Sequence, residues 1–195
     1  MSRAWWERCS RRRGCGTKAA ERIGIASSPS RPGSSESLAR PSPDERNFTI
    51  ALVFVDTNVF VYRFDDSEPA KQARCEAWLR HLWAEGSGRL SLQILQELYV
   101  TLTRKVANPL SSAEGRAVVR SLLSWDPVVV DAATLEGAWE LQDHYSLSWW
   151  DALVVSAARI AGCSVLLTED LSHDQDLDGV RVVDPFRVEP GTLEG

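Results

Sequence analysis

The sequence has no long hydrophobic segment and few cysteines. No stretch approaches the roughly eighteen consecutive apolar residues that a membrane-spanning helix needs, so we expect no membrane association. The four cysteines are scattered and form no C-x-x-C pair; they are Cys9, Cys15, Cys75 and Cys163. This spacing argues against a zinc site or a disulfide framework. It is typical of free thiols in a reducing compartment, and we therefore expect a cytoplasmic protein.

Common cofactor-binding motifs are also missing. The chain contains neither a Gly-rich P-loop nor a G-x-G-x-x-G fingerprint. The three histidines, His81, His144 and His173, lack the H-x-x-x-H spacing of helical zinc sites. Chemistry that depends on a bound nucleotide cofactor or on paired histidines therefore has no support in the sequence.

Basic residues are scarce outside the first quarter of the chain. Residues 1–48 hold ten Arg or Lys against five Asp or Glu, whereas the remainder holds twelve against twenty-two. An acidic remainder repels nucleic acid at long range. The charge balance alone therefore counts against a nucleic-acid substrate, unless local basic groups or bound cations act at the contact.

Residues 1–48 also differ in composition from the rest of the chain. Ser, Arg, Pro and Gly dominate there, and apolar residues show little helical or strand periodicity. We predict a disordered basic extension at 1–48, one catalytic domain at 49–187 and a C-terminal tail at 188–195.

Strands and helices alternate in the predicted domain. The unbroken apolar run at 49–55 is typical of a strand buried on both faces of a parallel sheet. Further strands are predicted at 89–92, 127–130, 165–167 and 180–183. Helices are predicted at 59–64, 69–84, 93–106, 112–123, 133–144 and 148–161. This alternation predicts an α/β fold with a central parallel sheet flanked by helices.

Two acidic residues lie just beyond the ends of predicted strands. Asp56 follows the first strand directly, and Asp170 comes shortly after the strand at 165–167. Open parallel sheets bind their ligands at this edge. Each residue also has an ordinary alternative role, because Asp is a good helix cap and a good turn residue.

Two further acids lie on predicted helices. Asp151 shares a helix face with Val154 and Ala158, so its carboxylate is expected to point toward packed material. A buried lone carboxylate costs several kcal/mol unless it is paired, protonated or bound to a cation. Ser148 lies three residues earlier, which is also the spacing of a helix cap. Glu97 flanks the apolar stripe of its helix and alone would be interpreted as a solvated residue.

A cluster of such acids indicates a particular chemistry. Carboxylates brought together raise one another's pKa unless a cation neutralises them. Mg²⁺ and Mn²⁺ prefer oxygen ligands of this kind. These ions activate water and stabilise displacement at phosphorus, so the acids predict hydrolysis of a phosphodiester.

Four segments resemble, in order and spacing, the motif blocks of PIN domains. They are Val53–Val59, Leu95–Leu98, Leu147–Leu153 and Leu166–Leu171. They look most like the VapC-type toxins of prokaryotic toxin–antitoxin pairs, and the resemblance covers about residues 49–187. It implies a PIN-like three-layer sandwich and a ribonuclease that depends on Mg²⁺, or alternatively Mn²⁺.

The resemblance also implies which residues form the site. The family's acidic, metal-binding and catalytic set is matched by Asp56, Glu97, Asp151 and Asp170. The polar residues that orient these carboxylates and bound water are matched by Asn58, Ser148 and Thr168. The role of Asp170 could be shared or taken by Glu169, Asp174 or Asp176.

Partners follow from the same resemblance. It implies an RNA substrate, a cognate antitoxin protein and a homodimer. A basic antitoxin side chain reaching an acidic pocket would be electrostatically complementary.

Three other functions fit parts of the pattern. A metal-dependent phosphatase or phosphotransferase would use Asp56 as nucleophile, but haloacid dehalogenase-like enzymes need a second Asp two positions on, where this chain has Asn58. A receiver-like phosphoacceptor would lack the Asp151 block. A catalytically silent PIN module used for binding is the non-enzymatic alternative, and acids at all four motif positions argue against it.

Overall fold

A five-stranded sheet forms the centre of the protein. The computed structural model describes residues 51–193, and the predicted extension at 1–48 lies outside them. The strands are β1 (Val53–Val55), β2 (Gly88–Arg89), β3 (Val165–Leu167), β4 (Asp176–Leu177) and β5 (Val180–Val183). They are ordered β2-β1-β3-β5-β4, and β4 is the one strand of this sheet that pairs antiparallel.

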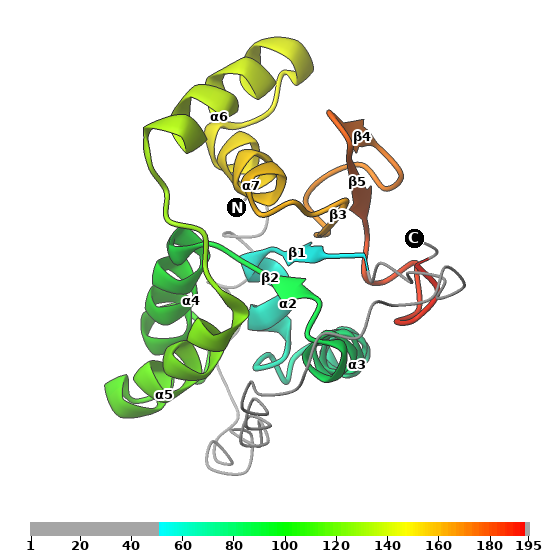
Figure 1. Cartoon of the computed structure of the whole chain (residues 1–195). Coiled ribbons are helices and arrows are strands. Elements are labelled where there is room, and N and C mark those ends of the chain that lie inside the picture. Colours follow the sequence, from blue (N-terminus) through cyan, green and yellow to red (C-terminus); the bar gives the residue numbers. More distant parts are fainter. Residues whose placement is uncertain (1–50, 194–195) are drawn as a thin grey trace, which may run out of the picture.

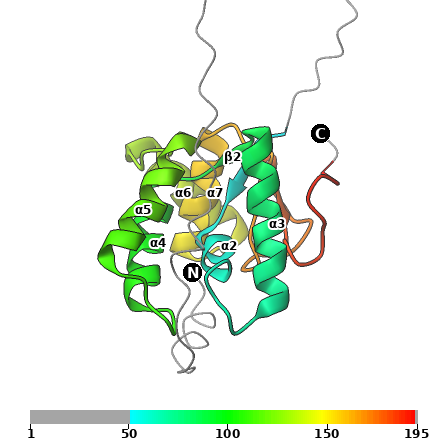
Figure 2. The ribbon, with the colours of Figure 1, turned by 90° about the horizontal axis from the view of Figure 1, so that it is seen from below.

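Helices cover both faces of this sheet. They are α2 (Thr57–Tyr62), α3 (Pro69–Glu85), α4 (Leu92–Arg104), α5 (Ser112–Leu122), α6 (Ala132–Tyr145) and α7 (Trp149–Ile160). Figure 1 shows α6 and α7 on one side of the sheet and α3 on the other, with α4 and α5 beyond the β2 edge. Figure 2 shows the same layers from the α3 side. The predicted α/β class, with a central and mostly parallel sheet flanked by helices, is confirmed.

The apolar run near residue 50 forms the middle of the sheet. Val53, Phe54 and Val55 are each at most 2% exposed. Because β1 lies between β2 and β3 and both sheet faces are covered, every side chain of the strand is buried. The continuous hydrophobicity of this segment therefore follows from its central position.

Local sequence signals set the helix starts. Ser148 caps α7, accepting a hydrogen bond from the backbone of Asp151, and Ser91 caps α4 in the same way. Ser111 and Glu114 form a reciprocal capping box at the start of α5. These caps fix where α4 and α7 begin, and so they position the acids that the two helices carry.

One predicted strand is absent from the sheet, and one observed strand was not predicted. The strand predicted at 127–130 is wrong: its Val128 makes only an isolated bridge to Ser91, and Val129 is 63% exposed. Pro127 has no N–H to donate, which limits pairing there. Strand β4 was not predicted, because two residues with a single buried apolar side chain give no readable period.

The chain beyond β5 remains in contact with the domain. The indole N–H of buried Trp78 donates to the backbone carbonyls of Pro185 (3.2 Å) and Val188 (3.1 Å). This segment is therefore attached to α3. In residues 51–193, no helix has the length and apolar character needed to cross a membrane.

Candidate active site

Asp56 begins the candidate site at the carboxyl edge of the sheet. It follows β1, is 6% exposed and caps α2, its Oδ1 accepting from the Thr57 N–H at 2.6 Å. The helix-cap interpretation is therefore confirmed. It accounts for only one carboxylate oxygen, and the other points into a separate network.

Asn58 and Thr168 link Asp56 to Asp170. The Asp56 Oδ2 accepts from the Thr168 hydroxyl at 2.8 Å and from the Asn58 amide at 3.1 Å. The same amide nitrogen donates to Asp170 Oδ2 at 3.2 Å and to Thr168 Oγ1 at 3.0 Å. The structure thus brings two predicted acids and two predicted polar residues into one hydrogen-bonded group, which we call the Asp56–Asp170 network.

Burial makes Asp56 hard to ionise. The pKa of this carboxyl rises from 3.8 to about 6, chiefly because of burial and in smaller part because of the nearby charge of Asp170. The hydrogen bonds from Thr168 and Thr57 act in the opposite direction without cancelling the rise. A cation bound at the network would reverse this balance, because it favours the ionised form.

Glu97 joins the network through a residue that the sequence did not single out. The Thr57 hydroxyl donates to Glu97 Oε2 at 3.1 Å, and the Gln93 amide donates to Glu97 Oε1 at 3.0 Å. Glu97 is therefore held by Thr57, the residue that follows Asp56, rather than left in solvent. Two signals could have found its partners: Thr57 lies beside Asp56, and Gln93 precedes Glu97 by one helical turn.

Asp151 lies in the first turn of α7, where it is half-buried. Its Oδ2 accepts from the Ser148 hydroxyl at 2.6 Å, while Ser148 Oγ accepts from the Asp151 N–H at 3.2 Å. The predicted capping interaction is therefore present. Because α7 leads into the parallel strand β3, its first turn lies toward the same sheet edge as Asp56.

The donor set fits a hydrated divalent cation. Within residues 51–193, no three Asp, Glu, His or Cys side chains converge closely enough to hold a metal alone. Mg²⁺, however, usually takes one or two carboxylates and keeps several waters. Asn58 Oδ1 and Gln93 Oε1 are buried without hydrogen-bond partners. In both amides the nitrogen donates to the acids, so the oxygen is directed away from the carboxylates and would need a bound water as its partner.

Glu169 has a different role from its neighbour Asp170. One of its oxygens accepts from the Tyr62 hydroxyl, and the other accepts from the Lys71 ammonium at 2.5 Å. That ammonium also lies over the rings of Tyr62 (4.4 Å) and Phe186 (4.6 Å). Glu169 is thus part of a separate ion-pair cluster.

The remaining two alternative acids lie outside the network. Asp174 is exposed and pairs with His173 at 3.3 Å, while Asp176 accepts from the Gly179 N–H at 2.9 Å. These contacts favour Asp170 as the acid that shares the site with Asp56.

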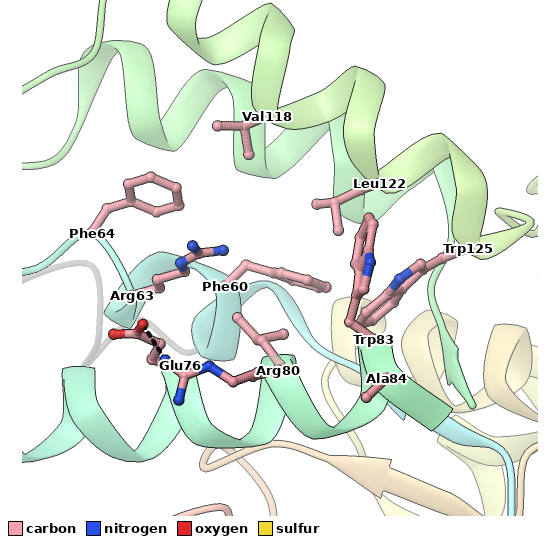
Figure 3. Close-up of a pocket in the computed structure, with 11 residues that line it drawn as sticks. Phe60, Arg63, Phe64, Glu76, Arg80, Trp83, Ala84, Val118, Leu122 and Trp125 are labelled. Atoms are coloured by element: carbon pink, nitrogen blue, oxygen red, sulfur yellow. Dashed lines mark hydrogen bonds and ion pairs between the residues drawn. The ribbon is translucent and has the colours of Figure 1, made fainter. Parts of the chain in front are cut away.

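A hollow separate from the carboxylates lies between α2, α3 and α5 (Figure 3). It encloses 330 Å³ and is mostly apolar; its walls include Phe60, Phe64, Leu79, Trp83, Val118, Leu122 and Trp125. Arg63 and Arg80 also line it, and Arg80 pairs with Glu76 at 2.7 Å. We call this hollow the α3–α5 groove.

Comparison with known proteins identifies the family. The family model of the PIN domain matches residues 53–175, and the chain therefore belongs to the PIN-domain family. Members of this family are generally nucleases. The match includes the whole Asp56–Asp170 network.

A solved structure has a similar fold. It is described as a toxin–antitoxin complex from Klebsiella pneumoniae, and its chain aligns with a TM-score of 0.50 and 19% sequence identity. The alignment covers 68% of this chain and 97% of that chain. At this identity the likeness shows the fold alone. No curated protein matches the sequence.

Proposed function

We propose that this protein is a Mg²⁺- or Mn²⁺-dependent endoribonuclease and the toxin of a type II toxin–antitoxin pair. The observation that carries the proposal is the Asp56–Asp170 network at the carboxyl edge of a PIN-family sheet. Two acids bridged by one amide, with the pKa of Asp56 raised by burial, form a site suited to a cation.

The side chains have distinct tasks in this proposal. Asp56 and Asp170 would hold the cation, and Asn58 and Thr168 would keep the two carboxylates in position. A bound divalent cation supplies an activated water and stabilises the leaving oxygen of the phosphodiester. Glu97, Asp151 and Ser148 complete the proposed set, Asp151 being oriented by Ser148.

The negative charge of the chain explains why RNA binding would need a cation. The net charge of −5 opposes binding of a polyanion, so RNA needs compensation where its phosphate meets the acids. We infer RNA rather than DNA from the resemblance to VapC-type toxins. A toxin acting on RNA would work in the cytoplasm.

Cleavage by the purified full-length chain tests the function. We expect total RNA to be cut with Mg²⁺ or Mn²⁺, and not with EDTA. Asp170→Asn is expected to lower the rate by about 100-fold or more, because removing a well-placed electrostatic group costs about this much. Asp174→Asn is the matched control, since Asp174 is an exposed acid outside the network. Cleavage that survives EDTA, or an unaffected Asp170 variant, contradicts the metal mechanism.

An antitoxin is the proposed protein partner, because the similar solved chain comes from a toxin–antitoxin complex. The α3–α5 groove offers an apolar surface with arginines on its wall. It fits a helix that carries apolar side chains on one face and an acidic side chain at its edge. We also propose a homodimer, on the basis of the family resemblance.

Filling the groove is expected to block this partner. Ala84 is exposed and lines the groove near Trp83 (Figure 3). Ala84→Arg should lower recovery of the co-expressed product of the adjacent upstream gene by about tenfold, which corresponds to about 1.4 kcal/mol. Ala70→Arg is the control, because Ala70 is exposed on the same helix but outside the groove. Equal recovery with both variants contradicts the assignment of this surface.

A further inference from the structure

Two tryptophans are exposed in the described part of the chain, one on each of the neighbouring helices α6 and α7. Trp150 on α7 is 49% exposed and Trp139 on α6 is 48% exposed, while Trp78 and Trp125 are buried. Trp149, beside Trp150, lies against Trp139 with ring centroids 6.2 Å apart and planes tilted by 30°. We call these three residues, Trp139, Trp149 and Trp150, the indole surface.

This surface adjoins the candidate active site. Trp150 immediately precedes Asp151 in the first turn of α7, so the two Cα atoms are about 3.8 Å apart. The Trp139–Trp149 contact joins this turn to α6, and the two helices pack along each other (Figure 1). The first turn of α7, a helix that packs against α6, thus carries both an exposed ring and an acid of the proposed set.

The charge of the protein restricts what such a surface can contribute. An acidic chain gains little long-range attraction for a polyanion, so binding must rely on contacts that do not need positive charge. Stacking of a base on an aromatic ring is such a contact, and it is available to any base that is not already paired and stacked.

We propose that the indole surface binds an unpaired nucleobase beside the phosphodiester held at the carboxylates, with Trp150 as the stacking ring. The inference rests on the proposed ribonuclease function and assigns to Trp150 the role of holding a base next to the bond that is cut. A fully paired helix offers no free base face to Trp150 and is a poor ligand for this surface.

Binding of RNA with and without bases tests the surface. The probes are a fluorescein-labelled oligoadenylate of about ten nucleotides and an abasic ribose-phosphate chain of equal length, both within the usual range of single-strand sites. Anisotropy is measured with the full chain carrying Asp170→Asn, so that the probes stay intact. Trp150→Ala should weaken oligoadenylate binding roughly 5- to 150-fold and abasic binding less than about twofold.

Two variants control for the ring and for the helix. Trp150→Phe keeps an aromatic face and should retain most of the affinity for oligoadenylate. Ile160→Ala removes a 51% exposed apolar side chain from the other end of the same helix and should change neither affinity. Melting temperature and light scattering are recorded for every variant.

Several outcomes overturn the inference. They are an equal loss for both probes, no loss for either, and a Trp150→Ala effect explained entirely by dissociation of a dimer. If Trp150→Ala does not fold, the two probes are compared on the protein that keeps Trp150. Equal affinity for the oligoadenylate and the abasic chain then contradicts the inference. Cleavage of total RNA is measured separately. Cleavage without base-dependent binding contradicts the proposed role of the indole surface but supports the ribonuclease function. Base-dependent binding without cleavage supports the role of the indole surface but contradicts the ribonuclease function.

Discussion

Asp56→Asn is expected to stabilise the metal-free protein by about 1–3 kcal/mol at pH 7 while abolishing RNA cleavage. The rise in the pKa of Asp56 from 3.8 to about 6 corresponds to about 3 kcal/mol at pH 7. An amide carries no charge to desolvate, but it loses part of the hydrogen bonding from Thr168 and Asn58. The expected gain therefore lies below the full amount.

The sign of the pH dependence follows from the direction of the shift. The folded state holds the Asp56 proton more tightly than the unfolded state, so this group favours folding most at low pH. That contribution is lost as the pH rises from about 3.8 to about 6. The stability difference between Asp56→Asn and the unchanged chain should accordingly shrink as the pH is lowered from 7 toward 4.

Urea unfolding in EDTA, repeated between pH 7 and pH 4.5, measures this difference. Adding Mn²⁺ should stabilise the unchanged chain by about 2.7 kcal/mol at a hundred times the dissociation constant, and Asp56→Asn far less. A variant that is less stable than the unchanged chain in EDTA at pH 7 would mean that the hydrogen bonds outweigh the buried charge.

Lys71→Met is expected to destabilise the protein by about 1–3 kcal/mol, because it leaves the Glu169 carboxylate without its cation. The Glu169 side chain is only 12% exposed and the Lys71 side chain 31% exposed, so solvent screens the pair only in part. Methionine keeps the apolar stem against the rings of Tyr62 and Phe186. The loss therefore reports mainly on charge.

A double-mutant cycle separates charge from packing. Glu169→Gln combined with Lys71→Met should recover much of the stability that Lys71→Met loses, since no charge then remains unpaired. Arg80→Met is the control: Arg80 pairs with Glu76 but is 74% exposed, and its loss should change stability by less than about 0.5 kcal/mol. Additive effects at Lys71 and Glu169 would show that the pair is not coupled.

The sequence predicted much of the fold because the apolar pattern is strong. The buried run that became β1 and the periodic helices were located to within a few residues. The sequence did not predict β4 or the conformation of the segment around Val128 correctly, because the pairing of such short segments depends on neighbours distant in the chain. Their local sequence carries too little information to fix it.

The candidate site was predicted in outline. The strand ends indicated Asp56 and Asp170, and the motif resemblance indicated Asn58 and Thr168, which the structure joins to them. The sequence could not show that Thr57 donates a hydrogen bond to Glu97 or that Lys71 forms an ion pair with Glu169. Both contacts cross between elements, so they depend on packing geometry rather than on spacing along the chain.

The bond between Thr168 and Asp56 has a consequence for synthesis of the protein. Its partners are 112 residues apart, so Asp56 leaves the ribosome long before the segment that completes its surroundings. At about 5–20 residues per second, this delay is about 6–22 seconds. A nascent or prematurely terminated chain ending before β3 lacks Thr168 and Asp170, which are half of the Asp56–Asp170 network. Under the proposed function, incomplete copies of the chain are therefore expected not to cleave RNA.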